Sequence, residues 1–149
     1  MRRSDRKMDD LEALNLLSIC EYGILSTVND DNQPYGVPLS YSLKENLIYF
    51  HSATEGSKLD NIIYNNKVCF TVVGKTRVLP GEFSTEYESV VVFGQASIIE
   101  GEEKLLALME IIKKYSPGFT MEGKEYMDRD AMKTKVVKIQ IEGFTGKRR

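Results

Sequence analysis

The chain has 149 residues, of which 42% are hydrophobic and 28% are charged, and its formal net charge is −2. This length and balance fit one globular domain, residues 1–149, and exclude a disordered chain. The near-neutral charge without a long basic stripe argues against nucleic-acid binding, and no apolar run reaches the roughly 18 residues needed to cross a bilayer.

The N-terminal segment, residues 1–20, begins with a short basic stretch that is followed at once by Asp9 and Asp10. It has no apolar stretch of signal-peptide length, so we expect a cytoplasmic protein. Further along the segment, Leu11, Leu14 and Leu17 recur at a spacing of three. That spacing predicts an amphipathic N-terminal helix.

The next segments are typical of strands. Residues 23–28, 35–43 and 47–52 are rich in aliphatic and β-branched side chains, and turn-forming residues separate them. We expect three antiparallel strands in succession. Residues 53–67 then break the pattern, and the spacing of Leu59, Ile62 and Ile63 predicts a short helix.

Two apolar runs, residues 68–73 and 88–100, predict central strands. The intervening residues 74–87 contain Pro80 and Gly81, which suits a loop or an irregular strand. The run from Val90 to Phe93 is apolar at every position, so we expect both of its faces to be buried. One small barrel does not easily cover both faces, which indicates that a second subunit covers part of the run.

The last third of the chain predicts a second helix over residues 101–116, with acidic residues in its first turn and a stop at Pro117. Residues 119–132 show no clear pattern. Alternating apolar residues at 137, 139 and 141 predict a final strand, and residues 143–149 are expected to form a C-terminal tail.

Together these elements predict a mainly β protein, a small antiparallel barrel with flanking helices packed outside it. Strands and helices do not alternate, and the glycine-rich loops GxGxxG and GxxxxGK[ST] are absent, so a Rossmann fold is disfavoured.

Few side chains suit metal or disulfide chemistry. Cys20 and Cys69 are too few for a disulfide framework, so buried free thiols are expected. His51 is the single histidine, and no HExxH or paired CxxC accompanies it. A zinc site is therefore not expected.

One segment is suited to binding an anion. It places His51 and Ser52 at the end of a strand, and then Gly56, Ser57 and Lys58 at the start of a helix. Unpaired backbone N–H groups, hydroxyls and an ammonium can meet there on a phosphate. From the spacing alone, the simpler interpretation is favoured: Lys58 is a solvated surface lysine and His51 is a hydrogen-bonded histidine at the end of a strand.

Four segments, 35–41, 48–58, 87–96 and 145–147, resemble in order and spacing the pyridoxamine 5′-phosphate oxidase-related, FMN-binding split-barrel proteins. Among these the sequence is most similar to the nitroimidazole-resistance (Nim) branch. The resemblance spans about residues 23–147. It implies a six-stranded split barrel that forms a homodimer, with one FMN in each of two clefts at the subunit interface.

The resemblance also implies which residues contact the cofactor. The segment 37–40 would lie along the isoalloxazine as an apolar wall. His51 and Ser52 would lie beside the flavin and its ribityl chain, and Lys58 would contact the phosphate. The second subunit would contribute Ser89, Val90 and Lys147. The full implied set is Val37, Pro38, Leu39, Ser40, His51, Ser52, Ala53, Ser57, Lys58, Ser89, Val90 and Lys147.

The sequence departs from these relatives at Ser57, where they often carry a second basic residue. A neutral donor forms a weaker hydrogen bond than a charged one, so weaker phosphate binding is expected. The arginine and histidine set of the vitamin-oxidising members is also missing, which argues against pyridoxine-phosphate oxidation.

The resemblance implies an FMN-dependent oxidoreductase that reduces a small acceptor such as a nitro-aromatic compound. His51 would be its catalytic residue, because an imidazole can exchange a proton near neutral pH. Two alternatives stay open. One is a flavin-binding storage or sensor protein without turnover, and the other is a split barrel that binds haem, with His51 as an axial ligand, or a deazaflavin.

Overall fold

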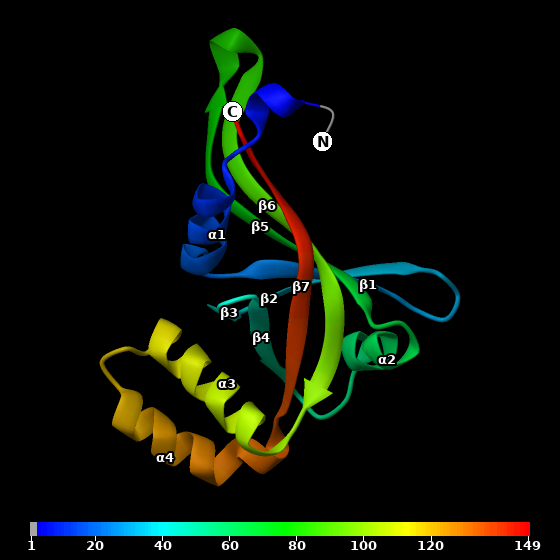
Figure 1. Ribbon diagram of the computed structural model, residues 1–149, viewed down its shortest axis with the longest axis vertical. Coiled ribbons are helices and arrows are strands. Elements are labelled where there is room, and N and C mark those ends of the chain that lie inside the picture. Colours follow the sequence, from blue (N-terminus) through cyan, green and yellow to red (C-terminus); the bar gives the residue numbers. More distant parts are fainter. Residues whose placement is uncertain (1–2) are drawn as a thin grey trace.

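The computed structural model describes residues 3–149, which form one seven-stranded sheet with helices on its outside (Figure 1). The elements in chain order are η1 (Ser4–Arg6), α1 (Asp10–Ile19), β1 (Gly23–Val28), β2 (Pro34–Leu39), β3 (Ser42–Lys44), β4 (Leu47–Ser52), α2 (Ser57–Tyr64), β5 (Lys67–Leu79), η2 (Pro80–Glu82), β6 (Ser84–Ile99), α3 (Gly101–Tyr115), α4 (Thr120–Asp130), η3 (Ala131–Lys133) and β7 (Lys135–Arg148).

The strand order is β2-β1-β5-β6-β7-β4-β3, and all neighbouring strands are antiparallel. The two edge strands, β2 and β3, are joined only by Ser40 and Tyr41, so the chain brings the edges together and rolls the sheet into a barrel. The predicted mainly β antiparallel split barrel is confirmed. It has seven strands because residues 35–43, expected as one strand, are divided at this connection.

The expected succession of three paired strands is wrong in its pairing. β1 pairs with β2 and β3 pairs with β4, but β2 and β4 lie far apart in the strand order. The reason is the break at Tyr41, whose backbone N–H donates to the Tyr115 hydroxyl at 2.9 Å instead of to a neighbouring strand. The chain changes direction there.

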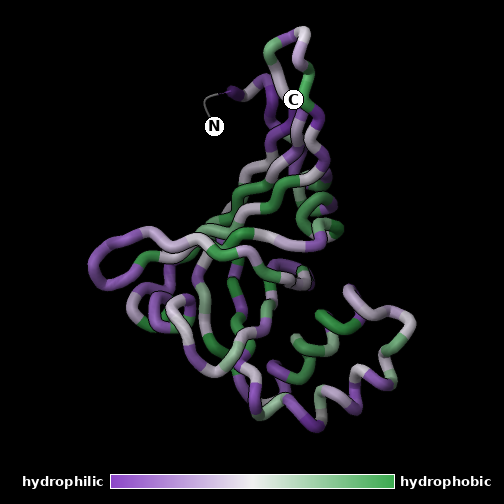
Figure 2. Tube along the Cα trace, turned by 180° about the vertical axis from the view of Figure 1, so that it is seen from behind, coloured by the Kyte–Doolittle hydropathy of each residue, from purple (hydrophilic) through white to green (hydrophobic). Residues whose placement is uncertain are grey.

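The barrel interior holds the main hydrophobic core. Tyr41, Phe50 and Phe70 are fully buried, and the rings of Tyr41 and Phe70 meet edge to face with centroids 4.8 Å apart. The Tyr41 hydroxyl donates to the Leu17 carbonyl of α1, and burial raises the pKa of this hydroxyl. Apolar stretches, green in Figure 2, follow the strands, whereas the β1–β2 connection is hydrophilic.

A long arm projects from the barrel at the top of Figure 1. Residues 74–87, expected as a loop or an irregular strand, are mostly strand: β5 and β6 stay paired to Leu79↔Ser84, with a register shift after Val73. The tail 143–149 is also strand, because β7 pairs with β6 as far as Glu88↔Arg148. Backbone hydrogen bonds form both segments, although the side chains of residues 75–78 are exposed and show no apolar alternation.

The helices largely match the sequence predictions. α1 begins after Asp9, whose carboxylate accepts from the Glu12 N–H at 2.8 Å, so the helix is shorter than residues 1–20; Met1 and Arg2 lie outside the described residues. α2 and α3 occupy their expected segments, and α4 was not expected. Within residues 3–149, no helix has the length and apolarity required to cross a membrane.

Candidate cofactor site

The turn between β4 and α2 brings five of the predicted site residues together. Gly56 precedes the helix with φ 130°, a backbone conformation that favours glycine, and no side chain caps the helix. Among residues 3–149, the backbone N–H groups of Ser57 and Lys58 have no acceptor. These two donors, the helix dipole and the Lys58 ammonium form an anion-binding arrangement.

Ser52 adds a buried hydroxyl at the end of β4. The residue is 5% exposed, and its Oγ has no hydrogen-bond partner within the described part of the chain. An unsatisfied buried polar group destabilises a protein by about 1–3 kcal/mol, so such groups are uncommon unless a ligand or water satisfies them. The orphaned hydroxyl, the free N–H groups and the lysine fit a phosphorylated polar ligand, with Ala53 in the connecting turn.

His51 and Ser52 lie on opposite faces of β4, because successive side chains of a strand alternate. Ile48 and Phe50 point into the barrel, whereas Tyr49 packs outside it against Ala107 of α3. His51 shares the outer face with Tyr49. The predicted role of Ser52 beside the ribityl chain and that of His51 beside the flavin therefore involve different faces of one strand.

The surroundings of His51 lower the pKa of its imidazole. The larger cause is partial desolvation, since the ring of this otherwise exposed residue lines a cavity beneath α3 and α4, and the smaller cause is the positive charge of Lys58. The imidazole is consequently neutral at pH 7. The effect of the Lys58 charge shows that the imidazole lies near the anion-binding turn.

An NMR titration checks this charge state, and the single histidine makes the signal unambiguous. We expect a midpoint below the usual value of about 6.5, and the Lys58→Ala variant should raise it only in part, because desolvation remains. Since the unfolded chain binds this proton first, His51 opposes folding below about pH 6.5 and has no effect well above it. A midpoint at or above the usual value would contradict this assignment.

The predicted flavin wall lies on an edge of the sheet. Val37 and Leu39 of β2 are half-buried and pack against the core, whereas Pro38 between them and Ser40 after them are exposed. Pro38 fits an edge strand because it cannot donate to a further strand. The segment thus offers side chains and backbone groups to a ligand.

Ser89, Val90 and Lys147 lie elsewhere, on the arm. Ser89 pairs with Lys147 across β6 and β7, and Val90 is fully buried. His51 pairs with Val136, eleven residues before Lys147 on β7, which corresponds to about 35 Å in an extended strand. Within one protomer, the arm residues and the β4–α2 turn do not reach the same ligand.

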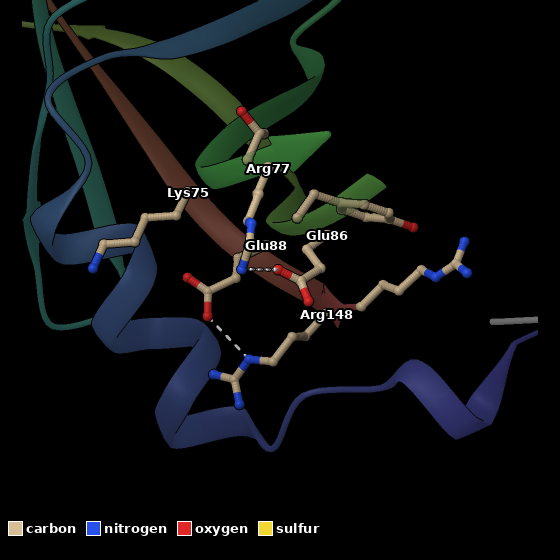
Figure 3. A pocket seen from close by; sticks show the side chains of 8 residues that line it. Lys75, Arg77, Glu86, Glu88 and Arg148 are labelled. Carbon is tan, nitrogen blue, oxygen red and sulfur yellow. Dashed lines mark hydrogen bonds and ion pairs between the residues drawn. The ribbon is translucent and has the colours of Figure 1, made fainter. Parts of the chain in front are cut away.

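A charged groove of about 460 Å³ also lies on the arm (Figure 3). Two of its cations are paired with carboxylates: Arg77 lies 3.9 Å from Glu86, and Arg148 contacts Glu88 at 3.0 Å and Glu12 at 3.1 Å. Lys75 and Arg149 also line the groove, so its charge is mixed.

Comparison with known proteins identifies the family. The family model described as pyridoxamine 5′-phosphate oxidase matches residues 9–148, nearly the whole chain. The chain belongs to the pyridoxamine 5′-phosphate oxidase family. No curated protein matches it.

Solved structures of similar fold agree with membership of the pyridoxamine 5′-phosphate oxidase family. A provisionally assigned 5-nitroimidazole antibiotic resistance protein from Bacteroides thetaiotaomicron is 26% identical with a TM-score of 0.78, covering 93% of this chain and 83% of that one. The FAD and haem binding protein from Mycobacterium smegmatis has a TM-score of 0.84 at 18% identity, covering 96% and 72%. An FAD-binding protein from Mesorhizobium loti has a TM-score of 0.69 at 22% identity, covering 97% of each chain. The last two show a shared fold.

The structure of this pyridoxamine 5′-phosphate oxidase family member adds one candidate site residue, Lys114, that the sequence did not indicate. Lys114 of α3 lines an open groove together with Ser40, and its Nζ donates to the Cys20 carbonyl at 2.7 Å and lies 3.8 Å from the Tyr41 ring centroid. Burial lowers the pKa of Lys114 to about 8. In the sequence it is one of several lysines on a helix, and no pattern distinguishes it.

Proposed function

We propose that the protein binds FMN in two equivalent clefts of a homodimer and reduces a small acceptor such as a nitro-aromatic compound. The observation that supports the proposal is the β4–α2 turn, which has free backbone N–H groups, Lys58 and the orphaned Ser52 hydroxyl. The family resemblance assigns the phosphate and the ribityl chain to these residues. When bound, FMN supplies electron-transfer chemistry that the side chains of this chain lack.

The chain itself contributes binding and orientation. Lys58 and the Ser57 hydroxyl hold the phosphate, and the start of α2 adds its positive dipole end. Val37 and Leu39 supply an apolar wall that excludes water from the ring, with backbone groups of β2 for its polar edge. The neutral His51 imidazole can accept or donate a proton near neutral pH.

A homodimer is part of the proposal for two reasons. The first is that Ser89 and Lys147 are too far from Lys58 to share its ligand unless they come from a partner. The second is exposed apolar surface: Val78 and Phe83 of the arm are 68% and 98% exposed, and Phe93, further along β6, is 53% exposed. Exposed apolar surface on a β arm favours burial against a second copy.

The absorption spectrum of the purified protein tests the cofactor, because flavin, deazaflavin and haem absorb differently. We expect one FMN per chain, retained or taken up on addition, reduction by NADH or NADPH, and reoxidation by a nitro-aromatic compound. Reduction without reoxidation would indicate the storage or sensor alternative. A colourless protein that does not bind added FMN, or a haem spectrum, would contradict the proposal.

Sedimentation equilibrium tests the dimer separately. We expect twice the chain mass at micromolar concentration, and a Phe83→Ser, Phe93→Ser variant should shift the equilibrium towards the monomer and weaken FMN binding in parallel. An FMN-binding monomer would contradict the shared cleft. The Met132→Ser variant, at a 93% exposed position outside the arm, is the matched control.

A further inference from the structure

A second, apolar cavity of about 130 Å³ lies between α3, α4 and the outer face of β4. His51 forms part of its wall, and most of the other lining side chains are apolar. These are Leu108, Ile111 and Ile112 of α3, Tyr126 and Met127 of α4, and Ala131, with Asp130 and Thr134 at one side.

The cavity is held open by the contact between the two helices. Gly123 of α4 lies directly against Ile112 of α3, so closely that a Cβ at this glycine would be 2.6 Å from Ile112 Cγ2. The backbone of α4 therefore rests on a side chain of α3. This contact fixes the helix separation and leaves the space beside it unfilled.

Among the described residues that line the cavity, none offers a free charge to a ligand. The Asp130 carboxylate is engaged by Arg129 and Lys133, each at 2.9 Å, and these contacts hold its pKa below the usual range. The Thr134 hydroxyl donates to the Asp130 carbonyl at 3.5 Å. Two further lining residues have polar atoms, Tyr126 with its hydroxyl and His51 with its ring nitrogens. The neutral His51 ring can donate or accept one hydrogen bond with a ligand.

The size indicates the class of ligand. A dry apolar cavity of about 150 Å³ in another protein takes up benzene, and burying such a ring is favourable by about 25 cal/mol per Å² of apolar surface. We propose that this cavity binds a small uncharged aromatic ring, with His51 facing a polar substituent of the ring. We infer further that it holds the ring of the acceptor; this second clause rests on the function proposed above.

Nitrobenzene is the probe, added to the full chain without flavin while backbone amide and His51 signals are followed by NMR. We expect saturable shifts confined to α3, α4 and His51, and at least tenfold weaker binding of benzoate, whose charge the cavity cannot compensate. The absence of such shifts, or shifts of the same size with benzoate, would overturn the proposal whatever the result with FMN.

Two variants locate the binding. Ala131→Phe fills the cavity and should weaken nitrobenzene binding at least tenfold, whereas Met132→Phe, at the adjacent exposed position outside it, should leave binding unchanged. Leu108→Ala enlarges the cavity instead and should favour 1-nitronaphthalene over nitrobenzene, a readout that does not depend on Ala131→Phe folding. If all variants bound nitrobenzene equally, the assignment of its binding site to this cavity would be wrong.

The flavin-loaded protein tests the acceptor clause. If nitrobenzene is reduced, Ala131→Phe should raise its KM at least tenfold while FMN affinity stays the same. An unchanged KM would show that the cavity does not hold the ring of the acceptor. The binding of an aromatic ring in the cavity would be unaffected by that result. Failure of FMN to bind would instead remove the function proposed above, since nitrobenzene binding to the flavin-free chain is measured independently.

Discussion

Lys58→Ala is expected to weaken FMN binding by about 10- to 150-fold and to leave riboflavin binding unchanged. A hydrogen bond to a charged group contributes about 1.5–3 kcal/mol, and riboflavin lacks the phosphate that Lys58 contacts in our proposal. Calorimetric titration of each ligand into the flavin-free protein measures both affinities. The difference between wild type and variant should shrink as salt rises, because ions screen this partly exposed charge.

The matched control is Lys124→Ala, which removes an exposed lysine of α4 and should not change either affinity. Ser57→Arg gives the opposite test, because it adds the second cation that related proteins often have there and should strengthen FMN binding alone. Equal weakening of FMN and riboflavin by Lys58→Ala would show that the lysine acts on the fold, and the phosphate assignment would be wrong.

Phe70→Ala is expected to lower the free energy of unfolding by about 3–5 kcal/mol, the range for truncating a buried aromatic side chain. Phe70 is fully buried on β5, and its ring packs on Tyr41 from one side and on the Gly23 backbone from another. Urea unfolding measures the loss, and both proteins are compared at the same concentration so that the contribution of dimerisation is the same in each.

The contact with Gly23 makes this prediction more specific. A Cβ at Gly23 would be 2.3 Å from Phe70 Cζ, so Gly23→Ala should destabilise the protein by about 1–3 kcal/mol through overpacking. Phe70→Leu removes the clashing ring atoms and should recover part of this loss in the double variant. Gly36→Ala on β2 is the control, since its nearest atom is 3.7 Å away. Additive losses would contradict the proposed contact.

Local patterns predicted the parts of the fold that bury one face. The leucine spacing gives α1, and the turn residue Gly56 between an apolar strand and a helical pattern gives the β4–α2 turn with Lys58. The arm was predicted only as a loop or an irregular strand, because most of its side chains are exposed and no apolar alternation marks residues 74–79 as strand. α4 was missed because its apolar residues are sparse.

The residues of the candidate site also include some that the sequence could place and some that it could not. Ser52, Ser57 and Lys58 are close in sequence, and local chemistry places them together. By contrast, whether His51 or Ser52 faces α3 depends on which side of β4 this helix covers, and the position of Lys114 beside Ser40 depends on a contact between distant segments. Such long-range placement is set by packing that a single sequence does not display.

The two-residue link between β2 and β3 couples parts of the molecule that are distant in sequence. Tyr41 bonds α1 through its hydroxyl and α3 through its backbone, and its ring fills the core beside Phe70. Releasing either sheet edge therefore strips both helices of a partner and exposes the core at once. We therefore expect the β2–β3 link to open only together with the rest of the barrel, so that slow exchange of the Tyr41 amide reports on the integrity of the whole domain.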